Sequence, residues 1–257
     1  MLAWSARGQM LVVDRAPQGA GAAVKVASGF VGDHFSLGAA GEVWVIDSVR
    51  VWVVPGKSSA KVTLFGGIEA PPPKPGDPEC DCHNLMPIQS TAMIAGAAFD
   101  FKDVRWSVPG GSQIQFGVLG LVPRGVTGGS HQLKKFDAKG KLLGEREGGA
   151  GKTGIAVQVW AHLSAGMSIQ QVSGVIEVTL HGAGTFEVTH ADVESLRFGP
   201  AGAAPLSNKI AGGDLVLTFS AADAGIRAAD LTACLAGRLQ NGVPFEACDG
   251  LAAARGK

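Results

Sequence analysis

Two cysteines and a histidine that could bind a metal lie together in one short segment, Cys80-Asp81-Cys82-His83. The first interpretation is a loop disulfide, formed between Cys80 and Cys82 or with a cysteine elsewhere. The second is a metal site, because thiolates and imidazole suit zinc or copper. A closed structural zinc site takes four ligands, and the neighbouring sequence offers only three. Covalent haem is excluded, since its attachment motif is C-x-x-C-H and this segment is C-x-C-H.

The other two cysteines, Cys234 and Cys248, lie in a predicted β-hairpin. Apolar runs flank Gln240-Asn241-Gly242, and Asn-Gly between such runs is a strong hairpin signal. A two-residue turn would place Cys234 opposite Asp249. A three-residue loop with a left-handed Gly242 would place the cysteines directly opposite each other, at a separation that a disulfide spans. We favour this second register, and the alternative is two buried free thiols.

Recognisable catalytic motifs are missing from the sequence. The six histidines are His34, His83, His131, His162, His181 and His190. None has a nucleophile or metal spacing such as G-x-S-x-G or H-E-x-x-H. We interpret His34 beside Asp33, and His190 near Asp192, as surface or turn residues rather than acid–base pairs. The sequence therefore predicts no catalytic residue and no enzyme, and the alternative is a hydrolase whose two carboxylates meet only in the fold.

The sequence of a glycine-rich segment, Gly148 to Thr153, is similar to a phosphate-binding loop. Arg146 stands where that motif requires its first Gly. The motif also needs a strand before it and a helix after it, whereas a charged stretch precedes this segment and a β-run follows. We therefore predict no cofactor-binding residue.

Composition and net charge indicate which partners the protein could bind and in which compartment it folds. The chain has 257 residues, 38 of them Gly, and its 22 basic and 22 acidic side chains give a net charge of zero. This balance predicts no nucleic-acid partner and no electrostatic attraction to a membrane surface, and no apolar run approaches the length of a membrane span. The opening residues do not read as a signal peptide, so either one was removed, which we expect, or the protein was never secreted. Four cysteines in two close pairs favour an oxidising compartment.

Short runs of β-branched and apolar residues, each ended by Gly, Pro or Asn, predict an all-β chain. Residues 42–54 are apolar on both strand faces, so we expect this strand to be buried between two layers with Trp44 and Trp52 in the core. The run 155–163 has the same pattern, with Trp160 in the core. Residues 69–86 form a long Pro-rich insertion that contains the first cysteine pair.

The C-terminal part resembles a β-sandwich module found near the ends of many large bacterial secreted and surface proteins. The matching residues are Thr185-Phe186-Glu187-Val188, Ser195-Leu196-Arg197-Phe198-Gly199-Pro200, Gly202-Ala203-Ala204-Pro205, Asp214-Leu215-Val216, Phe219, Gly225-Ile226, Cys234-Leu235-Ala236-Gly237, and Gly242 through Phe245 to Cys248-Asp249. In that family a stretch that looks like a calcium loop precedes the Asp-Leu-Val strand. Here that segment lacks most acidic ligands and contains Lys209, so we predict no calcium site.

The N-terminal part is similar to the jelly-roll-like domains of secreted bacterial proteins. The matching residues are Asp33, His34, Phe35, Leu37, Trp44, Ile46, Val49, Val51 and Trp52. Such domains often accompany surface anchors or hydrolases, which is an analogy of fold and not of activity.

These observations predict two β-sandwich domains in tandem. A jelly-roll-like domain covers residues 1–165, with the Pro-rich cysteine loop at 69–86, and an Ig-like domain covers 166–257. The predicted function is a non-catalytic structural or adhesion module, extracellular or on a bacterial cell surface. Its partner would be a second copy, in a fibre or surface layer, or a cell-surface or matrix polymer.

Two other functions remain open at this point. One is a carbohydrate-binding module of a secreted enzyme system, in which exposed aromatic rings stack on sugars. Only Trp4 and Trp106 are left for that role once the other tryptophans are assigned to the core. The other function is a metal or redox protein that uses Cys80, Cys82 and His83.

Overall fold

The structure is a computed structural model, which describes residues 8–17, 30–68, 85–92, 96–127, 133–136, 142–146, 153–172, 174–227 and 229–251. These residues form strands joined by turns, and their only helical element is the short 3₁₀ turn η1 (Val188–His190). The all-β class predicted from the sequence is confirmed.

The chain folds into two compact units. The C-terminal unit contains 162–257 together with 39–45 and the described part of 1–10. The N-terminal unit contains 11–38 and 46–161. The division falls inside two long strands, β3 (Val43–Ile68) and β12 (Val157–Val172). The arrangement of two sandwiches over 1–165 and 166–257 stays a prediction.

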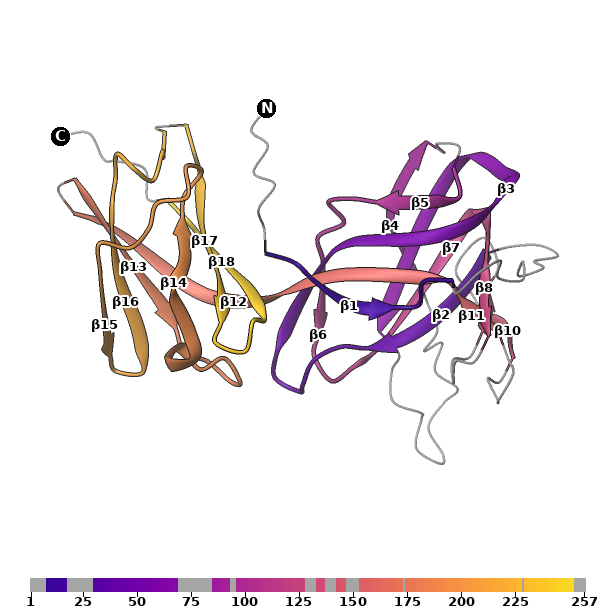
Figure 1. Ribbon diagram of the computed structural model, residues 1–257, viewed down its shortest axis with the longest axis horizontal. Helices are drawn as coiled ribbons and strands as arrows, with labels where there is room; N and C mark the ends of the chain where they lie inside the picture. Colours follow the sequence, from indigo (N-terminus) through magenta and orange to yellow (C-terminus); the bar gives the residue numbers. More distant parts are fainter. Residues whose placement is uncertain are drawn as a thin grey trace. The chain divides into compact units, whose positions relative to one another are not determined.

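The C-terminal unit has the strand order of an immunoglobulin constant-type domain (Figure 1). After β12 its strands are β13 (Val175–His181), β14 (Ala191–Phe198), β15 (Ser207–Ala211), β16 (Asp214–Ser220), β17 (Thr232–Leu239) and β18 (Pro244–Gly250). One series of neighbours is β12-β13-β16-β15, and the other is β14-β17-β18. These correspond to the A-B-E-D and C-F-G sheets of that domain type.

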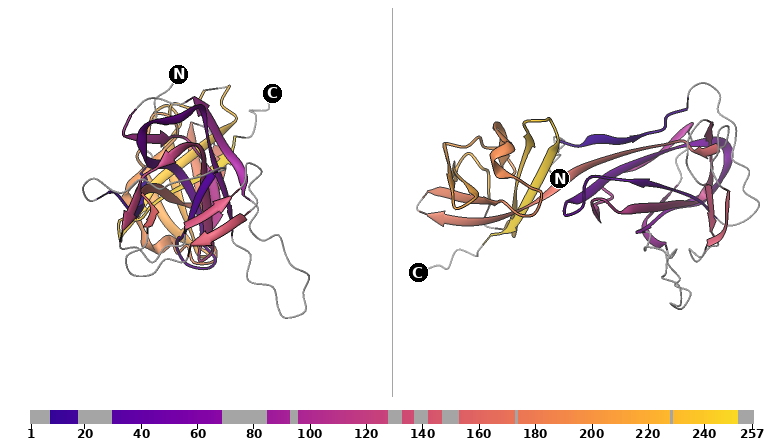
Figure 2. Two further views of the ribbon diagram at one scale, coloured as in Figure 1. Left: turned by 90° about the vertical axis from the view of Figure 1, so that its right-hand side faces the viewer. Right: turned by 90° about the horizontal axis from the view of Figure 1, so that it is seen from below.

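The two sheets of this unit bury one face each against a common core. Strands β13 and β16 alternate strictly between buried and half-buried residues, as expected for a sheet with one covered face. Phe198 of β14 lies 4.9 Å from Phe219 of β16 between ring centroids, so an aromatic contact joins the two sheets. Figures 1 and 2 show the strands of this unit as two layers.

The register of the β17–β18 hairpin is the one favoured from the sequence. The Leu239 N–H donates to the Val243 carbonyl at 2.8 Å, and Gly242 has a φ of 85°. Cys234 pairs directly with Cys248. A three-residue loop with a left-handed glycine therefore closes the hairpin, as predicted.

The N-terminal unit is built around β3. Its other strands are β1 (Met10–Asp14), β2 (Phe30–Ser36), β4 (Met86–Ala92), β5 (Ala98–Phe101), β6 (Trp106–Pro109), β7 (Gln113–Pro123), β8 (Gly125–Thr127), β9 (Leu133–Phe136), β10 (Leu142–Arg146) and β11 (Thr153–Ile155). Strands follow the order β10-β9-β2-β7-β3, and β4, β5 and β6 also pair with β3. A separate two-stranded sheet joins β8 to β11.

Strand β3 changes partners along its length. Its first half pairs with β5, where Val49 lies opposite Phe101. Its second half pairs with β7 and β4, and the register with β7 shifts between Val53 and Thr63. In the first half Val49, Val51 and Val53 are buried, so the alternate residues of this segment face away from the core.

Candidate functional site

The Cys234–Cys248 disulfide lies on the outer face of its sheet. Hydrogen-bonded pairs alternate along an antiparallel ladder, and counting from Leu239 places the cysteines at a non-hydrogen-bonded pair. Their Cα atoms are 4.1 Å apart, consistent with the close approach of such pairs. Their neighbours on each strand, Leu235 and Ala247, are buried and face the core, whereas Cys248 is exposed and Cys234 half-buried.

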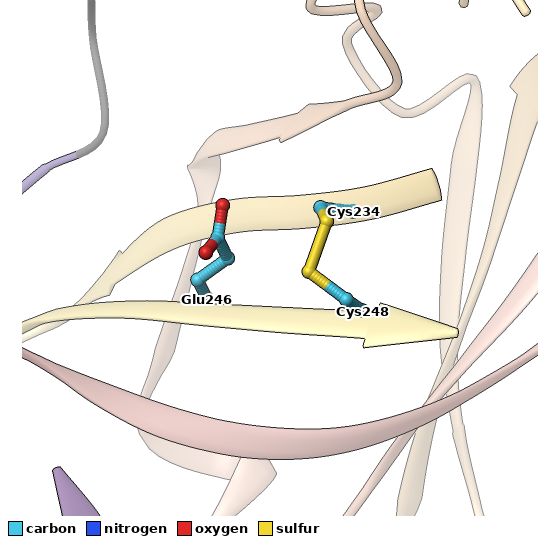
Figure 3. Close-up of side chains that lie close together, drawn as sticks. All are labelled: Cys234, Glu246 and Cys248. Carbon is cyan, nitrogen blue, oxygen red and sulfur yellow. A yellow bond between two sulfur atoms is a disulfide. The ribbon is translucent and has the colours of Figure 1, made fainter. Parts of the chain in front are cut away.

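A carboxylate lies beside this disulfide. Glu246 is two residues before Cys248 on β18, so both side chains project from the same face (Figure 3). One oxygen of Glu246 and the sulfur atoms of both cysteines lie within 4.8 Å of one another. On its other side Glu246 lies next to His162 of β12, with 3.6 Å between Oε2 and Nε2.

Parallel pairing of β12 with β18 positions that histidine. Ser164 lies opposite Glu246, and His162 is on the same face two residues earlier. The side chains of His162 and Glu246 are only 4% and 10% exposed. The outer face of this sheet therefore brings an imidazole, a carboxylate and a disulfide into one cluster, which we call the disulfide cluster: His162, Glu246, Cys234 and Cys248.

A second candidate site lies on the outer face of the N-terminal unit, where β5, β3 and β12 meet. Arg50 and Trp52 alternate with the buried valines of β3 and so share this outer face. The guanidinium carbon of Arg50 lies 5.5 Å from the ring centroid of Trp160 on β12, within cation–π range. We call these residues, with Asp100 of β5, the Arg–Trp face.

Asp100 completes this face through a two-pronged ion pair. Arg50 Nε donates to Asp100 Oδ1 at 2.6 Å, and the Nη2 atom donates to Oδ2 at 2.9 Å. These hydrogen bonds hold the pKa of the Asp100 carboxyl below its usual value. The pair fixes the guanidinium over the Trp160 ring, so the face presents an ordered combination of aromatic and charged groups.

The structure corrects the prediction that three tryptophans lie in the core. Trp44 is buried, as predicted, at 6% exposure. Trp52 and Trp160 are only half-buried and are not core residues. The reason is that Arg50 interrupts the second apolar face of the strand, and β5 supplies Asp100 as its partner in place of a covering layer.

The expectation that Asp33 is a surface or turn residue is wrong. Asp33 lies inside β2 with its side chain fully buried, 2.9 Å from Arg15 Nη1. Its Oδ2 also accepts the N–H of Ile155 at 3.0 Å, and its Oδ1 accepts the N–H of His34 at 2.8 Å. This carboxylate therefore links β2 to Arg15, which directly follows β1, and to β11. We interpret it as a structural centre, because its oxygens are committed to these donors.

One further histidine–carboxylate pair lies at the start of β16. His181 Nδ1 is 3.2 Å from Asp214 Oδ2, and the Gly182 N–H donates to Asp214 Oδ1 at 3.0 Å. The Gly182 hydrogen bond, with that of His181, holds the pKa of Asp214 below its usual range. A surface hollow of about 300 Å³ next to Gly182 is lined by residues 182–184 and 186–189 and by Gly213. No nucleophile joins this pair among the hydrogen bonds of the described residues.

The structure describes only some of the site residues that the sequence predicted. Cys80, Cys82 and His83 lie outside the described residues, so the disulfide and metal interpretations of that loop both stay predictions. His190 is exposed at the end of η1, as expected for a turn residue. We did not predict from the sequence that Glu246, His162 and Arg50 lie in these clusters. Glu246 could have been found from the sequence, because a spacing of two residues puts it on the same strand face as Cys248.

Comparison with protein-family models and with curated proteins gave no match to this chain. Within the part of the chain that the structure describes, no helix is long and apolar enough to cross a membrane.

Proposed function

We propose that this protein is a non-catalytic adhesion module, extracellular or displayed on a cell surface, that binds a surface or matrix polysaccharide through its Arg–Trp face. The observation that carries the proposal is the half-buried state of Trp52 and Trp160 beside the Arg50–Asp100 pair. Sugar rings stack on partly exposed aromatic rings, and their hydroxyl groups hydrogen-bond to fixed polar groups.

The chemistry of the face favours a neutral or weakly charged polymer. Arg50 and Asp100 neutralise each other, and the chain has no net charge to attract a polyanion. Beyond the pair, Gln158 of β12 donates from Nε2 to Asp14 Oδ1 at 2.9 Å, which extends the row of polar groups. A row of this kind on a strand face suits an extended polymer chain better than a small enclosed ligand.

An extracellular location is supported by the disulfide, because disulfides persist in oxidising compartments. The resemblance of both halves of the sequence to modules of secreted bacterial proteins is in keeping with this location. Polysaccharide adhesion also combines the leading prediction from the sequence, an adhesion module, with its first alternative, a carbohydrate-binding module.

Fibre assembly through a strand edge is the less favoured form of the adhesion function. The outer strand β15 is only five residues long and exposed throughout, with Ile210 53% exposed. Lys209 lies in the middle of this strand. A lysine on a short edge strand opposes edge-to-edge pairing, since a second copy paired at that point would bring two lysines together.

The proposal is tested by binding of the full chain to insoluble and soluble polysaccharides, followed by a glycan array. We expect Trp160→Ala and Trp52→Ala each to weaken binding by about tenfold or more, since stacking contributes on the order of 1–3 kcal/mol. Trp106→Ala is the matched control, because Trp106 is also half-buried but lies on β6 against Gly66 and outside this face. Absence of binding to any polysaccharide, or equal binding by the three variants, would refute the proposal.

A further inference from the structure

We propose that the disulfide cluster is a redox-controlled metal site, which binds Zn²⁺ through Cys234, Cys248 and Glu246 once the disulfide is reduced. The inference rests on the arrangement of these side chains and is independent of the polysaccharide proposal. Two thiolates and a carboxylate are ligands that zinc accepts, and thiolates select it over magnesium and calcium.

The distances suit such a site. In a tetrahedral zinc centre the ligand atoms lie about 3.3–3.8 Å from one another, given bonds of about 2.0–2.3 Å. One Glu246 oxygen and both sulfur atoms already lie within 4.8 Å of one another (Figure 3). Small side-chain rotations would bring them to ligand distance. The exposure of Cys248 leaves a fourth position open to water or an external ligand.

A histidine lies next to this carboxylate. His162 Nε2 lies 3.6 Å from Glu246 Oε2, and both side chains are nearly buried. Metal-bound carboxylates in proteins are commonly hydrogen-bonded by an outer partner, and a small movement of His162 would give Glu246 such a partner. The side chain of Glu246 is already nearly buried before a metal arrives, which lowers the cost of ordering and desolvating it.

The redox step balances with a dithiol as reductant. The Cys234–Cys248 S–S bond breaks and takes up two electrons and two protons, giving two thiols, while the dithiol becomes a disulfide. Zn²⁺ then displaces the two thiol protons and is bound by the thiolates. The metal and the disulfide exclude each other, because both use the same sulfur atoms.

The hairpin keeps the cysteines together after reduction. β17 and β18 pair over seven consecutive positions, from Thr232 opposite Gly250 to Arg238 opposite Pro244. β17 also pairs with β14, and β18 with β12. Neither cysteine lies at the end of the hairpin loop, so the backbone ladder maintains their separation without the S–S bond.

The test uses the full chain with Cys80→Ser and Cys82→Ser, which removes the other two thiols. The protein is reduced with a dithiol, and the dithiol is then removed under anaerobic conditions. The reduced protein is titrated with Co²⁺ as a spectroscopic substitute for Zn²⁺. We expect one Co²⁺ per chain with a thiolate-to-cobalt absorption band, displaced by Zn²⁺, and no binding by the oxidised protein. Glu246→Gln should weaken binding by about tenfold or more. Glu194→Gln, an exposed carboxylate of the same sheet, is the control and should leave binding unchanged.

Four outcomes would overturn the proposal. The reduced protein could lack the thiolate band, or Cys234→Ser could bind Co²⁺ as tightly as its parent. Glu246→Gln could match the control variant, which would remove the carboxylate from the site. Loss of the far-ultraviolet circular dichroism of strands on reduction would show that the hairpin depends on its disulfide, and a reduced site could not then form.

Discussion

Replacing Asp33 by Asn tests whether the buried ion pair with Arg15 holds the N-terminal unit together. The side chains of Asp33 and Arg15 are 0% and 9% exposed, and Nη1 and Oδ2 are 2.9 Å apart. Burial lowers the pKa of Arg15, and the charge and hydrogen bond of Asp33 oppose that shift. Asparagine keeps the size of the side chain but removes the charge that compensates the guanidinium.

The magnitude follows from the number of donors that meet at Asp33. Its two oxygens accept hydrogen bonds from Arg15, Ile155 and His34, whereas an amide has one oxygen and would direct its NH₂ at another donor. Removing one partner of a buried ion pair costs about 3–5 kcal/mol. Since domains are stable by about 5–15 kcal/mol, the variant should lose a large part of its stability.

The assay is urea unfolding followed by tryptophan fluorescence. Trp52, Trp106 and Trp160 all belong to the same unit as Asp33, so the signal reports chiefly on that unit. We expect Asp33→Asn to lower the unfolding free energy by about 3–5 kcal/mol. The exposed control Asp14→Asn should change it by less than about 0.5 kcal/mol.

A double-mutant cycle separates the ion pair from other effects of the substitution. Combined with Arg15→Met, Asp33→Asn leaves no buried charge, so the double variant should be more stable than the sum of the single losses predicts, by about 1–3 kcal/mol. Additivity within about 0.5 kcal/mol, or a loss of less than about 1 kcal/mol for Asp33→Asn alone, would refute this account.

Three further predictions concern charge, cross-linking and packing. The folded-state pKa of Asp100 is lowered from 3.8, so its ion pair adds stability above about pH 4 and loses it as the pH falls below that value. Urea unfolding between about pH 2 and 6 measures this effect. The unfolding free energy of Asp100→Asn should vary less with pH than that of the unchanged protein, and the difference should be below about 1 kcal/mol because the pair is partly exposed. Replacing Cys234 and Cys248 by Ala should lower the unfolding free energy by about 3 kcal/mol in denaturant titrations, since the bridge closes a loop with a sequence separation of 14. Gly237→Ala should cost about 1–3 kcal/mol in thermal unfolding, because the new Cβ would lie 2.5 Å from Leu196, whereas Gly166→Ala has room and should be nearly neutral.

The disulfide hairpin shows how far local sequence reasoning can reach. Asn241-Gly242 and the apolar runs beside it predict a hairpin with two possible registers, and the structure has the favoured one, with a three-residue loop. In that register, counting along the strands pairs Cys234 directly with Cys248. By contrast, His162 is far from this hairpin in sequence, and only the parallel pairing of β12 with β18 brings it to Glu246.

The two faces of β3 show where the sequence pattern fails. Apolar residues on both strand faces predicted burial on both sides, which is correct for Val49, Val51, Val53 and Trp44 but not for Val43, which is 45% exposed. Whether Trp52 contacts a second layer or solvent depends on what covers the sheet, and the strand's own sequence does not contain that information. The polar and aromatic partners of this face, Asp100 and Trp160, come from other strands.

The sequence by itself determined the all-β class, the closing hairpin and its disulfide, because turn chemistry and strand periodicity act over a few neighbouring residues. Tertiary structure alone decided that Asp33 is buried, since its partners Arg15 and Ile155 are 18 and 122 residues away. It also decided which tryptophans face outward and which carboxylate lies beside the disulfide. Burial and long-range ion pairing depend on which strands become neighbours, and that choice is made by the whole chain as it packs.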